Sequence, residues 1–160
     1  MTPGPPPLRP FGLVLHRDGS WSHEGVPITH RRLRALFDRS VRYLPEEGVY
    51  VVQVGPFRGR IEPEEAAFFV RSVDLERGVV ALSDRSEERL DPTSLRTSAL
   101  DGALLCTVKR RLVPGGLPAR FSHAAQAALL GAVEESGGRL ALRMAGALHP
   151  LAIETEGAAP

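Results

Sequence analysis

The chain is poor in several residue types, and each scarcity excludes a class of protein. It has a single cysteine, Cys106, among 160 residues, so no disulfide can form within it. No apolar run approaches the ~20 residues of a membrane-spanning helix. The first ten residues hold five prolines and lack the apolar core of a secretory signal. We therefore expect a cytoplasmic protein that does not bind membranes.

An excess of charge of one sign is also lacking. Twenty basic residues stand against 19 acidic ones, which gives a net charge of +1. Nucleic-acid-binding domains usually carry a basic face and a high isoelectric point, so we expect no nucleic-acid partner. Lysine occurs once, at Lys109, and every other basic residue is arginine. This bias reflects either GC-rich codon usage or a need for the bidentate anion contacts that arginine makes.

Motifs of catalysis and metal binding are missing as well. The chain has no Gly-x-Ser-x-Gly nucleophile turn, no phosphate-binding loop ending in Lys-Ser or Lys-Thr, and no dinucleotide fingerprint. Its five histidines lack zinc-protease spacing, and His16 and His23 can face each other across a hairpin without a third ligand. Glu62, Glu64 and Glu65 form either a solvated acidic face or a general-base or metal site. We expect no enzyme activity, no cofactor and no metal.

The residues that are present predict an α+β fold with a real core, because 42% of them are hydrophobic. Asp18-Gly19 predicts a two-residue hairpin turn after a strand over residues 12–15, since glycine accepts a positive φ. Residues 103–108 are an apolar run that predicts a strand with Cys106 as a buried structural thiol. Residues 63–67 either open a short helix or form an irregular loop.

The middle of the chain predicts antiparallel strands. Residues 68–73 and 79–82 alternate with turn signals and are joined at Glu76-Arg77-Gly78, where Gly78 takes the left-handed position. A polar turn over residues 83–86 leads to a short edge strand over residues 88–90.

A Gly-x-Pro turn, a helix and a strand occur in the same order in each half. The first copy comprises Gly25-Val26-Pro27, a helix capped by Thr29 with apolar residues from Leu33 to Leu44, and a strand over residues 49–54. The second copy comprises Gly116-Leu117-Pro118, a helix over residues 124–135 capped by Ser122, and a strand over residues 140–145. A constant offset of 91 residues aligns the two copies. Residue identity between them is close to chance, so the shared order is what indicates an ancient duplication.

These patterns divide the chain into two related halves, each a helix packed on a small, mostly antiparallel sheet. We expect a disordered, proline-rich N-terminus over residues 1–10 and a flexible tail over residues 154–160. Between them lie an N-terminal α+β subdomain over residues 11–98 and a C-terminal α+β subdomain over residues 99–153.

Two basic stretches are candidates for ligand binding. Phe57-Arg58-Gly59-Arg60-Ile61 follows the first long strand, and Lys109-Arg110-Arg111 precedes the second Gly-x-Pro turn, with Arg120 beyond it. Arginine grips phosphate or carboxylate in a fork. If the halves pack with pseudo-twofold symmetry, both stretches approach the seam and an anion or nucleotide-like ligand sits there. Alternatively, these arginines are edge charges that prevent sheets from associating.

Several segments resemble the bacterial family of unknown function DUF1285. The opening run Arg17-Asp18-Gly19-Ser20-Trp21, then Glu24-Gly25-Val26-Pro27-Ile28 and residues 33–37, is similar to the start of that family. Residues 50–54 and 61–68 resemble its central segment, and the likeness covers about residues 11 to 152. The resemblance implies a duplicated α+β core whose C-terminal part is loosely similar to pleckstrin-homology folds. It also implies a ligand site at the seam for a nucleotide-type molecule and a signalling role, with no enzyme activity.

Our leading hypothesis is a non-enzymatic ligand-binding module. Arg58 and Arg60 from the first half, with Arg110 and Arg120 from the second, would supply positive charge to an anionic ligand. Trp21 would provide a stacking face for a base, or would serve as a partly buried hairpin anchor.

Two other hypotheses remain open. The first is a protein–protein interaction module with no small-molecule ligand, which would show an exposed apolar patch or sheet edge. The second is an enzyme built on Asp84, Glu62 and His149, whose groups would have to reach a shared substrate.

Overall fold

The computed structural model describes residues 9–152 of the chain. Of the segments predicted to be disordered or flexible, residues 1–8 and 154–160 lie outside the described residues, whereas Arg9 and Pro10 begin the first strand. The chain divides into two compact units, Met1–Ala67 and Phe68–Pro160. Each unit buries its own set of apolar side chains.

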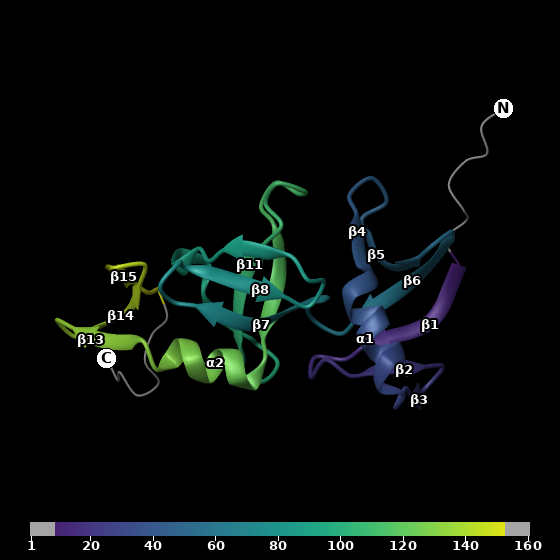
Figure 1. Ribbon diagram of the computed structural model, residues 1–160, viewed down its shortest axis with the longest axis horizontal. Coiled ribbons are helices and arrows are strands. Elements are labelled where there is room, and N and C mark those ends of the chain that lie inside the picture. Colours follow the sequence, from purple (N-terminus) through teal and green to yellow (C-terminus); the bar gives the residue numbers. More distant parts are fainter. Residues whose placement is uncertain (1–8, 153–160) are drawn as a thin grey trace. The chain divides into compact units, whose positions relative to one another are not determined.

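The first unit is a six-stranded sheet with one helix (Figure 1). Its elements are β1 (Arg9–Leu15), β2 (Trp21–His23), β3 (Val26–Pro27), α1 (Arg31–Ser40), β4 (Val41–Leu44), β5 (Val49–Val54) and β6 (Phe57–Pro63). The strands lie in the order β3-β2-β1-β6-β5-β4. Strands β1 and β6 are parallel, and the other neighbouring pairs are antiparallel. Helix α1 packs against β5.

The predicted hairpin between β1 and β2 is confirmed, with a longer loop than expected. The amide of His16 donates to the carbonyl of Ser20 at 2.8 Å, and the amide of Gly19 donates to the carbonyl of His16 at 2.9 Å. The loop between them therefore holds three residues. Gly19, the third of these, has a φ of 87°, which is why glycine is needed there.

Helix α1 begins and ends differently from the prediction. Its cap is His30 and not Thr29, because the His30 Nδ1 accepts a hydrogen bond from the Leu33 amide at 3.2 Å. The helix ends at Ser40, and the residues predicted to continue it to Leu44 form β4. Tyr43 lies opposite Tyr50 across the β4–β5 pair, with ring centroids 4.9 Å apart. Pairing with β5 thus outweighed the helical spacing of the apolar residues.

The second unit contains a curled six-stranded sheet, a helix and a separate small sheet. Its elements are β7 (Phe68–Asp74), β8 (Val79–Leu82), β9 (Glu87–Arg89), η1 (Pro92–Ser94), β10 (Arg96–Thr97), β11 (Leu104–Val108), β12 (Leu117–Phe121), α2 (His123–Leu130), β13 (Val133–Ser136), β14 (Arg139–Met144) and β15 (Ala147–Pro150). The large sheet has the order β10-β11-β12-β7-β8-β9, and the small one has the order β13-β14-β15. Helix α2 packs on β7 and β12.

Most predicted strands of the middle segment are confirmed. Gly78 closes the β7–β8 hairpin with a φ of 68°, and β9 lies at the edge of the sheet. Of residues 63–67, Pro63 ends β6 and the other four form an irregular connection and not a helix. Cys106 is fully buried on β11, and that burial raises the pKa of its thiol to about 12, as expected for a structural thiol.

Two elements of the second unit differ from the prediction. Leu117 and Pro118 do not break the chain, because they begin β12, whose residues 119–121 pair in parallel with residues 68–70 of β7. This pairing joins β7 to the later strands, so the division between units falls after Ala67 and not after residue 98. Helix α2 starts at the predicted cap, Ser122, but ends at Leu130, and β13 follows it.

The helix and the strand of the predicted repeat are present in both units, whereas Val26-Pro27 and Leu117-Pro118 lie in strands β3 and β12 and not in turns. Helix α1 is followed by the antiparallel meander β4-β5-β6, and α2 is followed by the antiparallel meander β13-β14-β15. The fold is therefore α+β and duplicated. Among the described residues, neither helix has the length and apolarity needed to cross a membrane.

The two repeat glycines provide a matched test of packing. Gly25 and Gly116 both have a positive φ, of 83° and 74°. A Cβ at Gly116 would lie 2.4 Å from the Thr107 Cγ2 and 2.7 Å from the Val108 carbonyl oxygen, whereas a Cβ at Gly25 would meet nothing within 4 Å. We expect Gly116→Ala to lower the free energy of unfolding by about 3 kcal/mol or more and Gly25→Ala by about 1 kcal/mol. Urea unfolding measures both, and equal losses would contradict the predicted clash.

Candidate functional site

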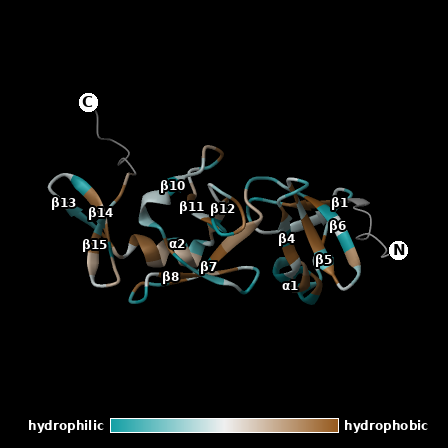
Figure 2. Cartoon of the chain, turned by 90° about the horizontal axis from the view of Figure 1, so that it is seen from above, coloured by the Kyte–Doolittle hydropathy of each residue, from teal (hydrophilic) through white to brown (hydrophobic). Residues whose placement is uncertain are grey.

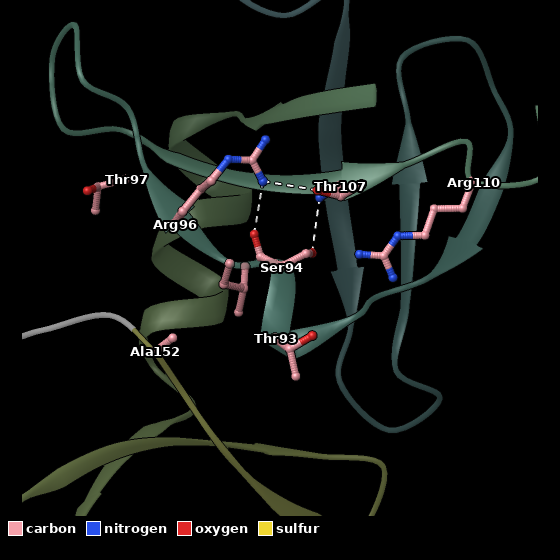
Figure 3. Close-up of a pocket in the computed structure, with 8 residues that line it drawn as sticks. Thr93, Ser94, Arg96, Thr97, Thr107, Arg110 and Ala152 are labelled. Carbon is pink, nitrogen blue, oxygen red and sulfur yellow. Dashed lines mark hydrogen bonds between the residues drawn. The ribbon is translucent and has the colours of Figure 1, made fainter. Parts of the chain in front are cut away.

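A pocket of about 540 Å³ opens in the second unit. One part of its wall comes from η1, from β10 and from Leu95 between them (Figure 3). The rest comes from Thr107 of β11, from Arg110 just after that strand, and from Ala152 after β15. The lining residues are Thr93, Ser94, Leu95, Arg96, Thr97, Thr107, Arg110 and Ala152. Four hydroxyl-bearing residues and two arginines therefore surround it.

Asp91 organises one side of the pocket. Its Oδ1 accepts hydrogen bonds from the Thr93 amide at 3.0 Å and the Thr93 hydroxyl at 2.6 Å, which caps η1. Its Oδ2 accepts from the Arg110 Nη1 at 2.5 Å. The Thr93 hydroxyl and the Arg110 guanidinium hold the pKa of Asp91 below its usual range. The charge of Arg110 is thus compensated where it reaches the pocket.

Ser94, Arg96 and Thr107 form the other side. The Ser94 Oγ accepts from the Thr107 amide at 3.0 Å. The Arg96 Nη1 donates to the Ser94 carbonyl at 3.0 Å and to the Thr107 Oγ1 at 3.1 Å. Figure 3 shows these bonds, with the Arg110 side chain approaching from the opposite side. Within residues 9–152, Arg96 forms no ion pair with a carboxylate, so its charge is uncompensated at the pocket wall.

The pocket has the chemistry of an oxyanion site. Guanidinium groups bind phosphate and carboxylate through paired N–H donors, and hydroxyl groups both donate and accept. With Asp91 counted against Arg96 and Arg110, one net positive charge remains beside the pocket. None of the lining residues is a histidine, a cysteine or a carboxylic acid.

The structure places Arg110 at this pocket but not Arg120. The Arg120 side chain is buried on β12, where its Nη1 and Nη2 donate to the two carboxylate oxygens of Asp101 at 3.0 and 2.5 Å. Arg120 therefore serves as a buried bidentate ion pair. Arg120 lies opposite Leu105 of β11 and is not one of the lining residues.

Trp21 does not offer a stacking face. It is 1% exposed, its Nε1 donates to the Asp38 Oδ1 at 2.8 Å, and its ring lies 5.4 Å from that of Phe37. Trp21 lies opposite Leu15 on the inner face of the β1–β2 hairpin, so a ligand cannot reach it. It is the hairpin anchor, fully rather than partly buried.

Arg58 and Arg60 belong to β6 in the first unit, a strand that the sequence did not predict. The Arg58 side chain is 12% exposed with its Nη2 4.0 Å from Glu47, and the Arg60 Nε lies 3.6 Å from the Glu62 Oε1. The expectation that Arg58 and Arg60 bind the same ligand as Arg110 and Arg120 stays a prediction.

Arg96 and its hydroxyl neighbours were missed by sequence reasoning. Asp91-Pro92-Thr93-Ser94 carries the signal of a capped turn, and Arg96-Thr97 follows it directly. Thr107 and Ala152 are distant in sequence, however, and no local pattern brings them to that turn. The pocket becomes visible only once β10 pairs with β11.

The residues considered for catalysis have structural partners. Asp84 accepts hydrogen bonds from the Lys109 Nζ at 2.6 Å and the Ser86 Oγ at 2.5 Å. Glu62 lies near Arg60 in the first unit, and the His149 Nε2 lies 3.1 Å from the Met144 carbonyl in the second.

No metal centre is formed by the described residues. Across residues 9–152, no group of three or more histidine, cysteine or carboxylate side chains could hold a metal ion. His16 does not pair with His23, because its ring contacts the Ser22 hydroxyl at 2.9 Å and the Glu64 carboxylate at 3.2 Å.

Comparison with known proteins identifies the fold. No family model matches the chain, and no curated protein gives a significant match. A DUF1285 family protein from Silicibacter pomeroyi DSS-3 has a similar structure, with 19% identity and a TM-score of 0.60 over 94% of this chain and 89% of that one. A DUF1285 family protein from Shewanella baltica OS155 aligns over 76% of this chain and 91% of its own, with 16% identity and a TM-score of 0.49. The fold expected from the DUF1285 resemblance is thus confirmed.

The contribution of the Asp84–Lys109 ion pair to stability should depend on pH, and this dependence can be tested. Burial would raise the pKa of Asp84, but the hydrogen bonds from Lys109 and Ser86 outweigh it and hold that pKa below its usual range. The stability that the pair contributes is therefore present above about pH 4 and lost as the pH falls through the folded-state pKa. We expect Lys109→Met, which keeps an apolar stem near Phe68, to cost about 2–4 kcal/mol at pH 7.

This cost should shrink as Asp84 becomes protonated, so urea unfolding at pH 7 and at about pH 2.5 should give unequal losses. Arg111→Met, at a neighbouring exposed arginine, is the control and should change stability by less than about 0.5 kcal/mol. A loss in Lys109→Met that is independent of pH would contradict the electrostatic origin of the effect.

Proposed function

We propose that this chain, which has the fold of DUF1285 family proteins, is a non-enzymatic ligand-binding module with a signalling role. Its ligand is an anion of nucleotide type, bound in the pocket lined by Arg96 and Arg110. The observation that supports this most is the uncompensated Arg96 guanidinium beside a ring of hydroxyl groups.

The size and polarity of the pocket fit such a ligand. A volume of about 540 Å³ lies within the roughly 300–1,000 Å³ typical of small-molecule sites. Among the described residues, the hydrogen bonds that the Arg96 guanidinium donates to the protein all come from its Nη1. Its Nε and Nη2 can therefore meet a phosphate in a fork. The hydroxyls of Thr93 and Thr97 are suited to the sugar or the remaining phosphate oxygens.

The lining favours binding over catalysis. It contains no side chain that would act as a general acid, a general base or an activated nucleophile near neutral pH. The lining contributes fixed positive charge and hydrogen-bonding groups, which bind an anion without catalysing its reaction.

A protein–protein interaction module is the second candidate function. It is favoured by a different observation, the cluster of arginines without acidic partners on α1 of the first unit. The two functions are compatible, because the pocket and the helix belong to different units.

Thermal unfolding with a panel of mononucleotides and cyclic dinucleotides at millimolar concentration tests the pocket. A ligand at a hundred times its Kd stabilises the native state by about 2.7 kcal/mol, which corresponds to a rise of roughly 5–11 °C in Tm for a chain of this size. We expect such a rise for the wild type and none for Arg96→Ala. Arg111→Ala, which removes the same charge outside the pocket lining, should keep it.

The absence of a shift with every nucleotide would reject the proposed function. A shift that survives Arg96→Ala but disappears in Arg58→Ala or Arg60→Ala would move the ligand site to β6 and reject this pocket.

A further inference from the structure

Helix α1 carries an unusual concentration of positive charge. Its ten residues include Arg31, Arg32, Arg34 and Arg39, and its first turn contains no acidic residue. Within the described residues, none of these four guanidinium groups forms an ion pair or a side-chain hydrogen bond. Elsewhere in the same unit, Arg17, Arg58 and Arg60 each lie within 4.0 Å of a glutamate.

The packing of α1 fixes these arginines in place. Phe37 packs against Trp21, and Asp38, the acidic residue of the helix, accepts the Trp21 indole N–H. Because the helix is held by these contacts, it cannot turn its arginines toward the sheet. Arg31, Arg32 and Arg39 are exposed, and Figure 2 shows hydrophilic residues along the helix.

Three of the arginines share one side of the helix. Arg32 and Arg39 are seven residues apart, which is close to two full turns and about 10 Å along the axis. Arg31 adjoins them, and the exposed Ala35 lies between the two ends. We call Arg31, Arg32 and Arg39 the arginine face. A small residue at its centre leaves room for a partner's backbone.

The positive charges of Arg31 and Arg32 are repelled by the positive end of the helix dipole. Within the described residues, no ion pair offsets this repulsion. A surface feature that lowers the stability of the free protein marks a functional site when no structural gain accompanies it. Binding of an anionic partner would relieve this repulsion, and that relief would add to the affinity.

The surroundings of the arginine face select the class of anion. Phe37 is the one aromatic residue of α1 and it packs inward, so the helix has no ring on which single-stranded bases would stack. Leu33, at 37% exposure, is the one exposed large apolar side chain of α1, which is too little apolar surface to anchor the helix in a lipid surface. The net charge of +1 gives no broad positive field for duplex nucleic acid. A short carboxylate-rich segment needs only the local arginines, which it binds through forked hydrogen bonds.

We infer that the arginine face is a docking surface for a carboxylate-rich segment of a partner protein. The positively charged helix and the segment would meet over about two helical turns, with side-chain carboxylates reaching Arg31, Arg32 and Arg39.

Fluorescence anisotropy with a labelled oligoglutamate peptide and the full chain tests this inference, and oligoglutamine of the same length controls for non-ionic binding. We expect the chain to bind oligoglutamate but not oligoglutamine, with an affinity that falls as salt is added. The triple variant Arg31→Ala, Arg32→Ala and Arg39→Ala should bind about tenfold more weakly or worse.

The matched control removes the same charge elsewhere. Arg89, Arg111 and Arg139 are exposed arginines outside α1, and alanine at all three should change the affinity by less than about twofold if the arginine face is the site. Arg96→Ala should also retain oligoglutamate binding, so failure of the nucleotide pocket and failure of this inference are distinguishable.

Three outcomes would overturn the inference. The first is an equal loss of affinity in both triple variants, which would indicate general charge attraction. The second is tighter arginine-dependent binding of single-stranded oligothymidylate or of phosphatidylserine vesicles than of oligoglutamate, which would assign the face to another class of partner. The third is a lower Tm of the free arginine-face variant at low salt, because removing unpaired like charges should leave the Tm unchanged or raise it.

Discussion

The ion pair between Lys109 and Asp84 is the interaction on which the second unit depends most. Strand β11 and strand β9 are not neighbours in the sheet, yet the Lys109 ammonium reaches Asp84 beyond β8, and its amide donates to both carboxylate oxygens of Glu88 on β9 at 3.0 and 3.1 Å. Lys109 also has a φ of 59°, a conformation that costs an ordinary residue free energy. The bonds that close the curled sheet offset that cost.

The pocket is a consequence of this closure. Once the end of β11 is bound near β9, Arg110 lies within reach of Asp91, and Asp91 in turn caps η1. The cap orients Ser94 toward the Thr107 amide, which leaves Arg96 along the pocket wall. The lone lysine of the chain thus supports a site made of arginine and hydroxyl groups. Its compact ammonium suits the buried position next to Asp84, where a planar guanidinium would have a different shape and bonding pattern.

The duplicated helix and meander serve different purposes in the two units. After α1 the meander joins a larger sheet through the parallel β1–β6 pair, whereas after α2 it remains a separate three-stranded sheet. The surfaces of the helices diverge as well. Helix α2 contains alanine and leucine with no arginine, while α1 carries four arginines. The same helix-and-meander order therefore carries two different sets of side chains, and of the two helices only α1 presents an arginine face.

Features that depend on residues close together in the chain could be predicted from the sequence. Glycines at positive φ marked the hairpins at Gly19 and Gly78, and the serine hydroxyl at Ser122 marked the start of α2. Tertiary structure alone decided that residues 41–44 and 117–121 are strands, because their backbone hydrogen bonds go to partners far along the chain. It also decided that Trp21 is buried and that Arg96 meets Thr107. Burial and convergence depend on which strands pair, and local spacing carries no information about that choice.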